Sequence, residues 1–104
     1  MTKSDRRQCY VATRVIDAWV KGKHSLRDSI DDLNGAICFL SDQERELSLF
    51  LRRKWAVLQE IQFYATYRSA GPISLEHCAM IESIMTEMKN ILVERLRRSV
   101  TSPE

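Results

Sequence analysis

Residues 42–70 contain neither glycine nor proline, the two residues that most often interrupt a helix. Their apolar side chains recur at spacings of three and four, which is typical of one face of an α-helix. The main stripe consists of Leu47, Phe50, Leu51, Leu58, Ile61 and Ala65. We therefore predict a continuous helix of 29 residues, Asp42–Ala70. It would be about 43 Å long, which is long for a chain whose radius of gyration should be about 13 Å.

A second long helix should follow this segment after a short connection. Gly71-Pro72 ends the first helix, because proline lacks an N–H group and disfavours helical geometry in the residue before it. Ser74 is the predicted cap of a helix over Leu75–Arg98. Only a few residues join the two helices, so they should pack as antiparallel neighbours. At the other end, Ser41-Asp-Gln-Glu44 matches a capping box.

Two shorter helices are predicted before the hairpin. The first covers Asp5–Lys21, with Ser4 as its cap and Gly22 as its stop. The second begins after Ser25. The apolar stripe of the first helix consists of Tyr10, Val11, Val15, Ala18 and Trp19. The apolar stripe of the second helix consists of Leu26, Ile30, Leu33, Ile37 and Leu40. Gly35 lies within the second helix, where it either permits close approach of another helix or is simply tolerated.

These elements predict an all-α fold of four helices, in which the two short N-terminal helices pack on a long antiparallel αα-hairpin. The chain should form a single domain over residues 1–104, with a frayed tail from about residue 99. The short helices would leave part of the hairpin uncovered. We therefore expect a homodimer formed through the two hairpin helices.

Composition places the chain among ordinary globular proteins. Hydrophobic residues make up 44% of the sequence and the net charge is only +2, so disorder is disfavoured. The N-terminus is polar, and the longest apolar run is far too short to span a membrane. Cysteine is odd in number, which favours reduced thiols and a cytoplasmic location. Cys38 and Cys78 are predicted to be core residues, whereas Cys9 could be exposed, and its reactivity is left open.

Catalytic and metal-binding patterns are weak. The sequence contains no GxSxG, Gly-rich phosphate loop or HExxH motif, and its histidines and cysteines lack zinc-ligand spacing. We expect no cofactor, no metal and no enzymatic activity. One alternative is a small enzyme that uses the carboxylates of Asp28, Asp31 and Asp32, although these residues also suit the first turns of a solvated helix.

Charge is distributed unevenly along the chain. Residues 1–27 contain seven Lys/Arg and two Asp residues, a local net charge of +5. This distribution supports an alternative function, a DNA-binding regulator that uses Arg6, Arg7 and Arg14.

Aromatic residues provide the stronger indication of function. Met85 and Met88 are expected in the core, whereas Tyr64 and Tyr67 lie off the main stripe and suit a protein interface. Trp55 could be a core anchor or a binding hot spot. The predicted protein-binding set consists of Trp55, Phe63, Tyr64 and Tyr67, with Arg52 and Arg53 at the rim.

A family resemblance points in the same direction. Gly71-Pro72, Ile81-Glu82-Ser83-Ile84 and the pair Met85 and Met88 resemble the C-terminal half of small helical quorum-sensing antiactivators. Such a family blocks a transcriptional activator by direct protein contact. Small helical immunity and phage inhibitor proteins have a similar size and composition. The resemblance implies a non-enzymatic inhibitor that binds another protein, such as a transcription factor.

Overall fold

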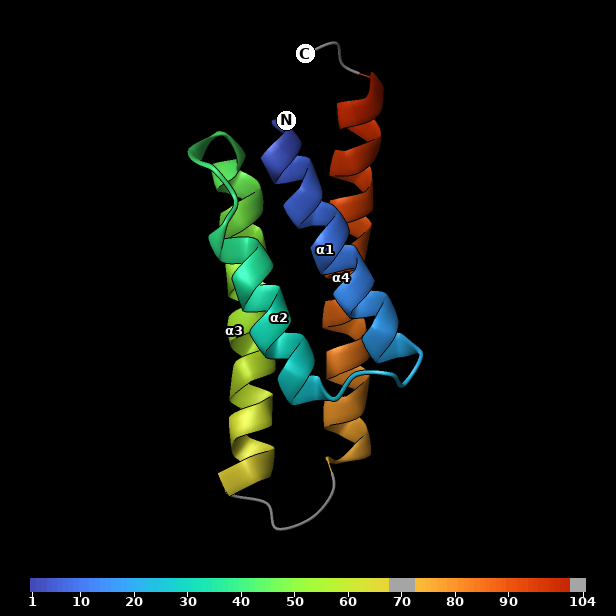
Figure 1. Ribbon diagram of the computed structural model, residues 1–104. Helices are drawn as coiled ribbons and strands as arrows, with labels where there is room; N and C mark the ends of the chain where they lie inside the picture. Colours follow the sequence, from blue (N-terminus) through green and yellow to red (C-terminus); the bar gives the residue numbers. More distant parts are fainter. Residues whose placement is uncertain (68–72, 102–104) are drawn as a thin grey trace.

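In the computed structural model, which describes residues 1–67 and 73–101, the chain is entirely helical apart from its connections (Figure 1). Its elements, in chain order, are α1 (Lys3–Val20), α2 (Leu26–Cys38), the 3₁₀ turn η1 (Asp42–Glu44), α3 (Arg45–Tyr67) and α4 (Leu75–Thr101). The predicted all-α class is confirmed. Residues 68–72, which include the predicted helix end and the Gly71-Pro72 break, lie outside the described residues.

The helices form an elongated bundle, in which α1 and α2 lie across the antiparallel pair α3 and α4. Contacts run around the bundle from α1 to α2, α2 to α3, α3 to α4 and α4 back to α1. Figure 1 shows that α3 and α4 continue past the turn between α1 and α2. Among the described residues, no helix therefore covers this end of α3 and α4 on that side.

Most helix ends follow local sequence signals. The Ser25 side chain accepts from the Asp28 N–H, and the Ser74 side chain accepts from the His77 N–H, as expected of caps. Gly22 adopts a φ of +72°, a conformation that costs glycine little, and it follows Lys21, the C-cap residue of α1. The predicted cap of α1 was wrong by two residues, because Thr2 rather than Ser4 accepts from the Asp5 N–H.

Ser41 does not form the predicted capping box. Its hydroxyl makes no cap hydrogen bond. Instead it donates to Asp5 Oδ2 at 2.5 Å, and the Ser41 N–H donates to Asp5 Oδ1 at 2.8 Å. A long-range partner has therefore displaced the local one. Residues 42–44 form a 3₁₀ turn, and α3 begins at Arg45, three residues later than predicted.

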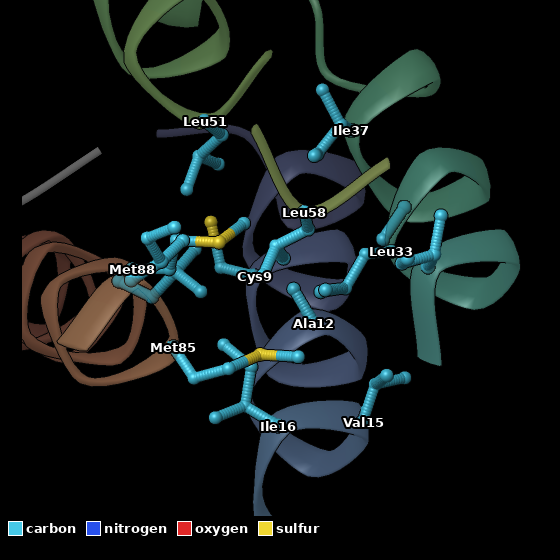
Figure 2. Close-up of a cluster of buried hydrophobic side chains, with 14 of the residues drawn as sticks. Cys9, Ala12, Val15, Ile16, Leu33, Ile37, Leu51, Leu58, Met85 and Met88 are labelled. Atoms are coloured by element: carbon cyan, nitrogen blue, oxygen red, sulfur yellow. The ribbon is translucent and has the colours of Figure 1, made fainter. Parts of the chain in front are cut away.

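The core lies where all four helices meet (Figure 2). Met85 and Met88 are fully buried, as predicted. The expected stripe of α1 was rotated: Tyr10 and Val11 are exposed, and the buried side chains are Cys9, Ala12, Val15 and Ile16. The three cysteine predictions were also wrong, because Cys9 is buried whereas Cys38 and Cys78 are exposed.

Helix α4 extends beyond its predicted end at Arg98. It continues to Thr101. Ser99 is buried, and its hydroxyl accepts from Arg6 Nε at 3.1 Å and from Arg6 Nη2 at 2.9 Å. One turn earlier, Arg95 forms an ion pair with the buried Glu44 of η1. These contacts join the end of α4 to α1 and η1.

Replacing Gly35 by alanine should raise the free energy of unfolding by about 1 kcal/mol, because alanine loses less backbone entropy in a helix interior. A Cβ atom added at Gly35 would have no neighbour within 4 Å, so no helix approaches closely there. Chemical denaturation of the two proteins measures the difference. Gly22→Ala provides the opposite control, because its positive φ should make that change destabilising. Loss of stability in Gly35→Ala would contradict the prediction.

Candidate protein-binding surface

Aromatic and apolar side chains, most of them exposed, gather where α3 ends and α4 begins. Phe63, Tyr64 and Tyr67 come from the last turns of α3, and His77 and Met80 come from the first turns of α4. Phe63 is 58% exposed and Tyr67 is 72% exposed, so neither ring belongs to the core. We call these five residues the hairpin-end surface.

Two ring contacts organise this surface. Phe63 and Tyr67 are one helical turn apart, and their ring centroids are 4.7 Å apart. Tyr64 meets His77 of the other helix edge-on, with 5.5 Å between the ring centroids. The second contact connects the two helices directly across the hairpin. The rings are thus held on helical backbone rather than on a loop, which limits the conformational entropy they lose on binding a partner.

An open groove runs between these side chains. Its volume is about 610 Å³, and its lining includes Val57, Ile61, Tyr64, His77 and Met80. Ile61 is buried and Val57 is partly buried, so the floor of the groove is continuous with the core. A shallow apolar groove with aromatic walls suits an apolar side chain of another protein.

Trp55 and the two arginines do not belong to the hairpin-end surface. Trp55 is partly buried, and its Nε1–H donates to the Ile30 carbonyl at 2.8 Å, which joins α3 to α2. Arg52 and Arg53 are exposed. Arg53 precedes Phe63 by ten residues, which is about 15 Å along a helix. They therefore lie along α3 rather than at the rim of the groove.

The basic residues of α1 line one surface but differ in how exposed they are. Arg6 is partly buried and bonded to Ser99. Arg7 and Arg14 are exposed and share a shallow surface with Lys3 and Tyr10. The spacing of residues 3, 7, 10 and 14 places these four side chains on one outward stripe of the helix. Arg6 lines the same surface, so the structure brings together all three arginines predicted for nucleic-acid binding.

The remaining candidate residues for catalysis or metal binding do not form a site among the described residues. Asp28, Asp31 and Asp32 are all exposed. Across residues 1–67 and 73–101, no three His, Cys, Asp or Glu side chains form a group that could hold a metal ion. Burial, together with the nearby carboxylates of Glu44 and Asp5, raises the pKa of the Cys9 thiol to about 11. Cys9 is therefore a poor nucleophile near neutral pH.

No helix within the described part of the chain is both long enough and apolar enough to cross a membrane.

The sequence interpretation did not include His77 in the binding set. The sequence contained a signal for it, because Tyr64 lies seven residues before Gly71 and His77 lies five residues after Pro72, which places them within one helical turn of the same level in a hairpin. In an antiparallel hairpin, residues equally distant from the connection lie opposite each other. Met80 follows His77 by three residues, on the same face of α4.

Comparison of the chain with protein-family models, with curated proteins and with solved structures found no match.

Proposed function

We propose that this chain is a non-enzymatic regulatory protein that binds and inhibits another protein, such as a transcriptional activator, through the hairpin-end surface. The observation that carries the proposal is the exposed cluster of Phe63, Tyr64 and Tyr67 at the end of α3, where Tyr64 also contacts His77 of α4. The resemblance to quorum-sensing antiactivators implies the same function. Inhibition would occur by occlusion, in which the helical surface covers the functional face of the partner.

Surface composition supports this proposal. Aromatic residues and methionine are enriched at protein interfaces, and large apolar side chains exposed together are uncommon on monomeric proteins. The hairpin-end surface combines three aromatic rings with Met80. A cytoplasmic location is part of the proposal, because the exposed thiols of Cys38 and Cys78 are unpaired and would remain reduced there.

Alanine at both Tyr64 and Tyr67 should abolish capture of the partner while leaving the fold intact. Interface tyrosines at a binding hot spot contribute about 2 kcal/mol or more each, whereas exposed side chains contribute little to folding. Affinity capture from native lysate, followed by mass spectrometry, compares the variant with the natural protein. Thermal unfolding of both proteins tests whether the fold is preserved.

Tyr10→Ala is the matched control for this experiment. Tyr10 is 47% exposed and Tyr64 is 48% exposed, but Tyr10 lies on α1, away from the hairpin end. The control should retain the partner. If Tyr10→Ala loses the partner as completely as the Tyr64/Tyr67 double variant, the hairpin-end surface is not the binding site. A double variant that fails to fold would instead assign the two tyrosines a structural role.

A DNA-binding regulator is the second candidate, favoured by the exposed stripe of Lys3, Arg7, Tyr10 and Arg14. A cluster of cations on a helix contacts phosphates, and such binding weakens steeply with salt. Nuclease treatment in the same capture experiment distinguishes the two functions. A protein retained in stoichiometric amount after nuclease supports the inhibitor, whereas loss of every bound molecule after nuclease supports DNA binding. Arg6 is unsuitable for the test, because its contact with Ser99 gives it a packing role.

A further inference from the structure

The outward side of α3 carries its own regular pattern, separate from the stripe that faces the core. Exposed residues recur there at alternating spacings of four and three, the spacing of a helix–helix seam. We call this set the outer face of α3: Leu49, Arg53, Ala56, Glu60, Phe63 and Tyr67. Buried Leu47, Leu51, Leu58 and Ile61 occupy the opposite side of the same helix.

The outer face of α3 has no covering element within the described structure. All six of its residues are exposed, and the main contacts of α3 are with α2, α4 and η1 on its other sides. Arg53 and Glu60 have no ion-pair partner among the described residues, although other charges of the hairpin, such as Lys54 with Glu87, are paired between helices. The face thus presents two unpaired opposite charges beside three large apolar side chains, Leu49, Phe63 and Tyr67.

The outer face of α3 is complementary to the same face of a second, antiparallel copy when both are centred on Ala56. Leu49 and Phe63 are each seven residues from Ala56, in opposite directions. Arg53 is three residues before Ala56 and Glu60 is four after it, which correspond to about 4.5 and 6 Å along the helix axis. Because helical positions seven apart nearly repeat, Arg53 and Glu60 lie on the same flank of the face. A two-fold axis through Ala56 that makes two copies of α3 antiparallel keeps each flank opposite itself. It therefore places Arg53 opposite Glu60 of the second copy, twice.

We propose that the occupant of this face is a second copy of the chain, bound as an antiparallel α3–α3 pair centred on Ala56. The small Ala56 side chain permits close approach at the two-fold axis, and Leu49 of each copy packs against Phe63 of the other. A single helix pair buries less than the roughly 1,600 Å² of a standard interface, so the dimer should be weak, with a micromolar dissociation constant. The sequence predicted a dimer interface formed by both hairpin helices, and this proposal assigns the interface to α3 alone.

The dimer has a consequence for regulation that rests on the proposed function. Phe63 and Tyr67 belong both to the outer face of α3 and to the hairpin-end surface. Self-association would cover them, so dimerisation and partner binding would compete. The monomer would then be the binding-competent form, and high concentration would reduce the active fraction.

Sedimentation velocity of the purified chain, without any partner, tests the dimer independently of the proposed function. From low micromolar to submillimolar concentration, the mass should rise from 12.1 kDa toward twice that value. Arg53→Glu and Glu60→Arg should each weaken dimerisation about tenfold or more, because each creates two like-charge pairs. Arg27→Glu, an exposed charge reversal on α2, is the control and should dimerise like the natural chain.

Mixing the two charge-reversal variants makes the test specific for the antiparallel register. A mixed dimer of Arg53→Glu with Glu60→Arg contains two Glu–Arg pairs and no like-charge pair. The equimolar mixture should therefore regain dimerisation at a concentration where each variant alone is monomeric. A natural chain that stays monomeric throughout the range overturns the proposal. So does a dimer that is unaffected by the charge reversals, or a mixture that fails to associate.

Discussion

Leu58→Ala is expected to lower the free energy of unfolding by about 3–5 kcal/mol, the range for a leucine removed from a tightly packed core. Leu58 lies on α3 and is 0% exposed. Figure 2 shows its side chain among Cys9, Ala12 and Leu33, so it meets both α1 and α2. Truncation removes apolar contacts with two helices at once, and a rigid bundle cannot close the resulting cavity.

Leu75→Ala is the matched control, because it makes the same chemical change on an exposed side chain. Leu75 is 90% exposed at the start of α4, so its replacement should change stability by no more than about 0.5 kcal/mol. Urea denaturation followed by far-ultraviolet circular dichroism measures both variants against the natural chain. Similar midpoints for the two variants would mean that the core does not lie at Leu58.

Asp5→Ala is expected to cost about 3 kcal/mol, although it removes only a small polar side chain. Asp5 is 0% exposed, and its two carboxylate oxygens accept from the Ser41 N–H and the Ser41 hydroxyl. Hydrogen bonds to a charged group contribute about 1.5–3 kcal/mol each, and their removal leaves two donors of the partly buried Ser41 without this partner. The contact also joins the first turn of α1 to the segment between α2 and η1.

Acid should weaken this contact in a defined direction. Burial raises the pKa of Asp5. Hydrogen bonds from Ser41 and Thr2 and the positive N-terminal amine lower this pKa, and together they outweigh the effect of burial. The pKa therefore lies below the ordinary value of 3.8. A carboxyl group whose pKa is lower in the folded state stabilises the fold fully above its unfolded pKa. This contribution is lost as the pH falls through the folded pKa. The natural chain should therefore lose stability below pH 3.8 more steeply than Asp5→Ala.

Asp28→Ala provides the comparison for Asp5. Asp28 is also an acid in the first turn of a helix, but it is exposed, and its loss should cost only about 0.5 kcal/mol through the helix dipole. Unfolding curves of the natural chain and both variants at neutral and acidic pH provide the measurement. Equal costs for the two substitutions, or an acid response unchanged by Asp5→Ala, would show that the buried carboxylate is not an anchor.

Local signals predicted the helices well because their causes are local. Ser25, Gly22 and Ser74 act within a few residues of their own positions, by capping a helix end or permitting a left-handed turn. The stripe that includes Leu47, Leu51, Leu58 and Ile61 is long enough that its periodicity identifies the buried face without knowledge of any neighbour. Tyr64 and Tyr67 were expected at the surface for the same reason, because they lie off this stripe.

Predictions failed where two orientations had similar local support or where a distant group competed. Helix α1 has apolar side chains on more than one side, so the buried face, with Cys9 and Ala12 rather than Tyr10 and Val11, depended on how it packs against α2 and α4. Ser41 was available to cap α3, but its hydroxyl bonds the charged Asp5 instead. Cysteine is small and only weakly polar, so its sequence context did not separate buried from exposed positions.

The hairpin-end surface shows the same division between what local spacing predicts and what packing decides. Its aromatic residues on α3 were identifiable from helical spacing, because spacing alone places a side chain off the core face. The neighbours of these residues were not identifiable from spacing. The contact of Tyr64 with His77 and the separation of Arg53 from Phe63 depend on where two helices lie in space. Trp55 could have been a core anchor or a hot spot, and its hydrogen bond to Ile30 shows that it anchors α3 to α2. The sequence alone determined which segments are helical and which side of α3 is apolar, since both follow from interactions within a few residues. Only the tertiary structure decided which polar groups are buried together and which aromatic rings remain uncovered, because those outcomes depend on contacts between residues far apart in the chain.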